Sequence, residues 1–107
     1  MREEKLNVYD ELIAKSSRFK RKGKTMPYTS ANGYMFTLFN KEDQIGIRLS
    51  KESQARFKEK YNSGPYFSHG AKMKDYVIVP DEMLNDLDHL SKYVEESYDF
   101  VCSLPPK

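Results

Sequence analysis

Several features are scarce in this chain of 107 residues. It contains a single cysteine, Cys102, and no tryptophan. One cysteine excludes a disulfide within the chain, and we therefore expect a cytoplasmic protein. No apolar run approaches the ~20 residues that a membrane-spanning helix needs, so we expect no membrane contact. The formal net charge is only +2, which is too small to require a polyanionic partner.

The features of a signal peptide are missing as well. Residues 1–15 are acidic and amphipathic, whereas a signal peptide has a basic start followed by a continuous apolar stretch. Aromatic residues, in contrast, make up 13% of the chain, and disordered proteins are poor in them. We expect residues 1–107 to form one folded domain.

Apolar residues at helical spacing predict three helices. The first covers residues 3–17, the second follows the capping residue Ser50, and the third starts at a new cap, Asn85. Gly64 is expected to end the second helix in the left-handed conformation, and Pro105 to lie just beyond the third helix.

Three segments predict strands. Residues 34–39 are mostly apolar, residues 45–49 alternate, and residues 76–79 form a last strand. The polar residues 40–44 join the first two strands into a hairpin, and the irregular loop 18–32 can hold a short edge strand. This order predicts a two-layer α+β domain on an antiparallel sheet. The predicted core comprises Ile13, Phe36, Ile47, Phe57, Val77, Leu90 and Val94.

Short strand, cap and turn segments spread over nearly the whole chain carry a family resemblance. They are residues 24–30 (KTMPYTS), 32–33 with 35–36 (NG, MF), 48–52 (RLSKE), 73–74 with 76–77 and 79–82 (MK, YV, VPDE), 97–98 (SY) and 104–105 (LP). In these segments the chain resembles the N-terminal domain of the TfoX (Sxy) family of bacterial proteins.

The resemblance implies a fold similar to YjbR-like and secretion-chaperone-like domains, with one sheet and helices on one face. The full-length namesake regulates natural competence and carries a second, C-terminal helical domain, whereas we expect this chain to be a stand-alone small domain. None of the matching segments is a catalytic signature.

No group of residues predicts catalysis or metal binding. His69 and His89 are the only histidines, and neither belongs to a cluster of metal ligands. We expect His89 to face solvent and Cys102 to be a small buried side chain at a helix end rather than a nucleophile. We therefore expect no catalytic residue, no bound metal and no cofactor.

The densest run of charge is basic, and it is flanked by the aromatic residues Phe19 and Tyr28. Its members are Arg18, Lys20, Arg21, Lys22 and Lys24. Phosphate contacts together with base stacking require such residues, so nucleic-acid binding is one interpretation. A solvated surface loop is the other, and any binding by a flexible run is expected to be weak.

The hydroxyl-rich segment Tyr28, Thr29 and Ser30 predicts a turn whose side chains bond to their own backbone. The alternative is a loop that contacts a ligand, with a site between the sheet and residues 26–33.

The strand at residues 34–39 has apolar side chains on both faces, although a two-layer domain buries only one. If Phe36 faces the helices, then Met35, Thr37 and Phe39 face outward, because strand side chains alternate. That second face needs a cover, which is the loop 18–32, a ligand or another subunit. We expect a homodimer formed through this face.

The leading interpretation of function is a non-enzymatic interaction or regulatory module with an unidentified protein partner. The first alternative is weak nucleic-acid binding through the basic run. The second is a small ligand-binding protein or enzyme.

Overall fold

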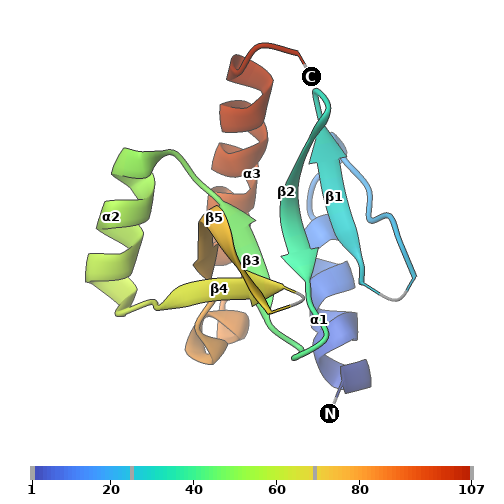
Figure 1. The fold of residues 1–107 in the computed structure, drawn as a ribbon. Coiled ribbons are helices and arrows are strands. Elements are labelled where there is room, and N and C mark those ends of the chain that lie inside the picture. The colour runs from blue at the N-terminus through green and yellow to red at the C-terminus, as the bar shows by residue number, and fades with distance from the viewer. Residues whose placement is uncertain (1, 25, 69, 107) are drawn as a thin grey trace.

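The computed structural model describes residues 2–24, 26–68 and 70–106. Figure 1 shows its helices and strands, in which groups of consecutive strands are separated by helices along the chain. The helices are α1 (Arg2–Ala14), α2 (Lys51–Tyr61) and α3 (Leu87–Ser103), with a short 3-10 helix, η1 (Asp81–Asn85), before α3. The strands are β1 (Tyr28–Ala31), β2 (Tyr34–Phe39), β3 (Ile45–Arg48), β4 (Pro65–Ser68) and β5 (Ala71–Ile78). Within these ranges, no helix has both the length and the apolar character needed to cross a membrane.

The strands form one antiparallel sheet in the order β1-β2-β3-β5-β4. All three helices contribute to the core on one face of this sheet, since Tyr9 of α1, Phe57 of α2 and Leu90 of α3 share it with Ile47 and Val77. The predicted α+β class and order of elements are therefore confirmed.

The predicted core is buried at every position, because residues at helical or alternating spacing fall on one face of their element. Each of the seven predicted members is at most 2% exposed: Ile13, Phe36, Ile47, Phe57, Val77, Leu90 and Val94. The second helix begins as predicted, with the Ser50 hydroxyl accepting a hydrogen bond from the Ser53 N–H.

Element boundaries differ from the prediction at several ends. The first helix stops at Ala14. Asn62, with φ of 52°, takes the left-handed conformation expected of Gly64, because asparagine also tolerates that region. Asp86 rather than Asn85 caps α3, and its carboxylate accepts from the His89 N–H. The last strand starts at Ala71, well before Tyr76, because it pairs with β4.

A β-bulge in β2 overturns the prediction of which side chains face outward. The pairing with β1 steps from Thr29–Thr37 to Ser30–Met35, so Phe36 has no partner in β1. The extra residue shifts the alternation of side chains. Phe36 and Thr37 both face the helices, and Phe39 does as well.

Contacts on the two faces establish this shift. Phe36 packs edge-on against Phe19 and Tyr98. The Thr37 hydroxyl lies 2.7 Å from the Tyr9 hydroxyl. Thr37 and Phe39 are therefore not outward-facing, and both are fully buried. Met35 and Leu38 point to the opposite face, where they belong to a second apolar cluster with Tyr66 and Tyr76.

The β4–β5 hairpin covers much of that opposite face. Tyr66 lies directly on Gly46, so close that a Cβ atom there would be 2.5 Å from the ring. The Tyr66 hydroxyl donates to the carbonyl oxygens of Leu38, at 2.8 Å, and Gln44, at 3.1 Å. Tyr76 stacks beside Tyr66, with ring centroids 6.0 Å apart. The cover is thus mainly this hairpin, and residues 18–32 contribute only Met26 and Tyr28 at its margin.

Candidate functional site

The hairpin leaves part of the outer sheet face uncovered, and a groove of about 350 Å³ lies there. We call it the methionine groove. Its lining comes from β1 and the segment before it, from β2, and from the β4–β5 hairpin: Met26, Tyr28, Met35, Leu38, Ser68 and Met73. Its size is at the lower end of the range for ligand pockets.

The methionine groove is apolar in character. None of its lining residues among those the structure describes carries a charge, and its three methionines are half-buried. The tyrosine hydroxyls behind it are already used, because Tyr66 donates to Leu38 and Tyr76 donates to the carbonyl of Met35 at 2.8 Å. Burial raises the pKa of both tyrosines, which keeps them protonated and donating. Flexible thioether side chains adapt to apolar groups of different shape.

The segment Tyr28, Thr29 and Ser30 is strand β1, so the predicted turn is wrong. The backbone of β1 pairs with β2, and the three side chains make separate contacts. Tyr28 lines the methionine groove. The buried Thr29 hydroxyl lies 2.6 Å from that of Thr37. Ser30 accepts from the Lys22 ammonium at 3.1 Å. The three side chains do not form one ligand site.

Acidic residues neutralise much of the basic run. Arg18 donates to Glu95 and to Asp99 of α3, each at 3.0 Å, and these bonds raise its pKa. Arg21 donates to Asp10 of α1 at 2.9 Å. Lys20 and Lys24 are exposed and have no partner in the described part of the chain. The run is thus tied to two helices and is not a freely flexible loop.

We expect this basic run to bind polyanions only weakly and without sequence preference. Lys20→Ala with Lys22→Ala should lower binding to mixed-sequence single-stranded DNA, because each change removes a potential phosphate contact. A charge-matched control, Lys51→Ala with Lys60→Ala, changes α2 on the other side of the molecule (Figure 1) and should lower binding less. Fluorescence anisotropy at increasing salt measures the effect. Tight, sequence-selective binding at physiological salt would contradict this prediction.

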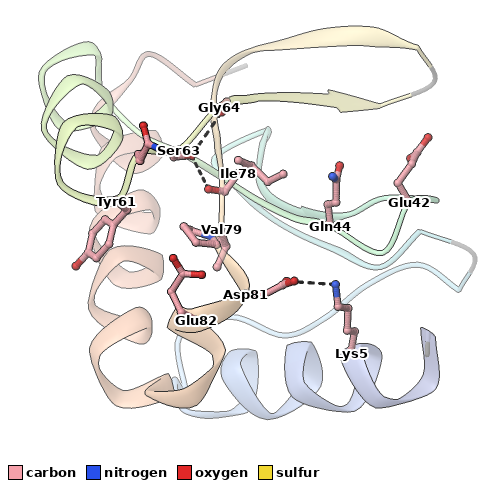
Figure 2. Close-up of a pocket in the computed structure, with 12 residues that line it drawn as sticks. Lys5, Glu42, Gln44, Tyr61, Ser63, Gly64, Ile78, Val79, Asp81 and Glu82 are labelled. Atoms are coloured by element: carbon pink, nitrogen blue, oxygen red, sulfur yellow. Dashed lines mark hydrogen bonds and ion pairs between the residues drawn. The ribbon is translucent and has the colours of Figure 1, made fainter.

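A second cleft, of about 390 Å³, is polar. It lies between the start of α1, the β2–β3 turn, the end of α2 and η1. Figure 2 shows Lys5 reaching toward Asp81, with Glu42 and Glu82 on opposite sides of the cleft. Lys5, the lysine that lines this cleft, forms an ion pair with Asp81 at 3.2 Å. Across the described ranges, no group of three or more His, Cys, Asp or Glu residues could hold a metal ion.

His89 belongs to a half-buried aromatic cluster between α2 and α3, so the prediction that it faces solvent is wrong. The Tyr61 hydroxyl lies 2.7 Å from His89 Nε2 and 3.2 Å from the Tyr93 hydroxyl. Burial raises the pKa of Tyr93 to about 12. The sequence carried a signal for this cluster. His89 and Tyr93 have the same i,i+4 spacing as Phe57 and Tyr61 on α2. These contacts join the two helices.

The remaining candidates do not form a site. Cys102 is exposed and not buried as predicted, because it lies on the solvent side of α3. His69 lies outside the described residues.

Sequence reasoning located only one side of the methionine groove. The alternative of a ligand site beside residues 26–33 anticipated Met26 and Tyr28. It missed Ser68 and Met73, because these residues reach the groove only when the hairpin folds across the sheet. The alternation of Tyr66 and Ser68 along β4 was the available signal.

No protein-family model matches the chain, and no curated protein matches it.

Proposed function

We propose that this protein is a non-enzymatic interaction or regulatory module that holds an apolar segment of a protein partner in the methionine groove. One observation carries the proposal: a groove whose described lining is apolar stays open on the sheet face where the chain's own Tyr66 and Tyr76 are buried. Exposed apolar surface of this kind marks interaction sites. Methionine-rich surfaces are typical of sites that accept varied apolar side chains.

The chemistry of the lining favours an apolar segment over a small polar substrate. Small-molecule sites combine an apolar lining with a few polar groups that fix the orientation of the ligand. Here the hydroxyls of Tyr66 and Tyr76 bond to backbone carbonyls, and among the described lining residues only Tyr28 and Ser68 carry side-chain hydroxyls. Contacts that exclude water from apolar side chains then supply the binding free energy.

We propose that the chain is a relative of the TfoX N-terminal domain and that it is bacterial and cytoplasmic. The chain forms a single sheet with helices on one face, as the resemblance implies, and this supports the proposal. The neutralised Arg18 and Arg21 make nucleic acid a weaker candidate than a protein partner.

Methionine methyl resonances test the proposed function. Titration with the peptide acetyl-Leu-Phe-Leu-amide is expected to shift the signals of Met26, Met35 and Met73 together and saturably, because all three line the groove. Met83, which is buried in the helix-side core, is an internal control whose signal should stay in place. Met73→Lys should weaken the binding by adding a charge to an apolar lining.

Two results would contradict the proposed function. One is the absence of any saturable shift at the three groove methionines. The other is an equal shift at Met83, which would mean that the peptide disturbs the whole fold.

A further inference from the structure

The apolar side chain best suited to fill the methionine groove belongs to the same chain. Phe67 of β4 is 45% exposed and is the one large hydrophobic residue in the described ranges that stands this far in solvent. Exposure alternates along β4, so Tyr66 and Ser68 point inward while Phe67 points out. Ser68, its immediate neighbour, lines the groove.

We infer that the occupant of the methionine groove is Phe67 of a second copy of this chain, in a two-fold homodimer. The inference rests on the proposed function and names its partner. Phe67 does not line its own groove, because it alternates along β4 with Ser68, which does. In a two-fold contact the same patch is used by both copies, so each Phe67 enters the groove of the other. An exposed apolar side chain and an apolar groove therefore complement each other across the dimer.

The backbone at Phe67 is held before association. The buried Asn40 side chain donates from Nδ2 to the Phe67 carbonyl at 2.7 Å. A segment whose backbone is already held loses less conformational freedom on binding.

Charges near Phe67 permit two copies to meet. Lys72 is its cross-strand partner in β5 and lies on the same face of the hairpin. Glu42 lies two residues beyond Asn40, in the turn that holds the Phe67 carbonyl. Both charges are exposed, and both signs occur beside the proposed contact. With a formal net charge of only +2, the two copies face little overall repulsion.

Sedimentation equilibrium over micromolar concentrations tests the dimer. The wild-type chain is expected to be a reversible dimer, and Phe67→Ser should raise the dissociation constant at least about tenfold, as expected for a central aromatic contact. Phe67→Leu, which keeps an apolar side chain, should weaken the dimer less. Met73→Lys should also raise the dissociation constant, because it adds a charge to the groove that Phe67 enters.

A mixing experiment separates this contact from other dimers. Phe67→Ser keeps an intact groove, and Met73→Lys keeps an intact Phe67, so an equimolar mixture is expected to form a heterodimer with one restored contact. Circular dichroism verifies that both variants fold. A strictly monomeric wild-type chain, a dimer unchanged in Phe67→Ser, or no heterodimer in the mixture would each overturn the inference.

The peptide titration distinguishes the absence of this dimer from the absence of any interaction site in the methionine groove. The Phe67→Ser chain should bind acetyl-Leu-Phe-Leu-amide at Met26, Met35 and Met73 at least as well as the wild type, because its groove is free of the second copy. Peptide binding by a chain that never dimerises would keep the groove as an interaction site and remove only the second copy as its occupant.

Discussion

Replacing Leu90 by alanine is expected to lower the free energy of unfolding by about 2–5 kcal/mol. Leu90 is fully buried in α3, within the core that all three helices share with the sheet. The substitution removes apolar contacts and leaves a cavity that the surrounding sheet and helices cannot fill completely. Urea denaturation followed by circular dichroism measures the loss.

A control on the same helix isolates the effect of burial. Lys92 is exposed, and Lys92→Ala should change the free energy of unfolding by no more than about 0.5 kcal/mol. A loss below about 0.5 kcal/mol for Leu90→Ala, the size of an ordinary surface change, would place Leu90 outside the core.

Gly46→Ala is expected to destabilise the protein by about 1–3 kcal/mol, the usual cost of overpacking. The new methyl group would lie 2.5 Å from the Tyr66 ring. The ring cannot move freely, because its hydroxyl donates to the carbonyls of Leu38 and Gln44. Thermal or urea denaturation measures the loss. Because Tyr66 holds β4 against the sheet, the same change should also weaken peptide binding in the methionine groove.

Two further variants make this prediction specific. Gly64→Ala is the matched control, since a Cβ atom at Gly64 would meet nothing within 4 Å. It should be nearly neutral or slightly stabilising. In a Tyr66→Ala background, Gly46→Ala should lose most of its cost, because residues in contact are energetically coupled. An equal cost in both backgrounds would mean that the Tyr66 ring is not what limits residue 46.

The sequence by itself determined the three helices, the central strands and the seven predicted core positions. Residues such as Phe57 and Leu90 are buried because helical spacing places them on one face. Ser50 caps α2 because its hydroxyl reaches an N–H group only three residues away. These features depend on residues close together in the chain, so the order of elements and the α+β class followed as well.

Only the tertiary structure decided which side chains reach the outer face of the sheet and which charged side chains form ion pairs. The bulge at Phe36 depends on how β1 pairs with β2, and it turned Thr37 and Phe39 inward. Arg18 meets Glu95, which is 77 residues away along the chain.

The methionine groove was likewise decided by the tertiary structure, because Met73 joins Met35 only when the hairpin crosses the sheet. Such contacts depend on the packing of distant segments, and neither composition nor periodicity carries that information.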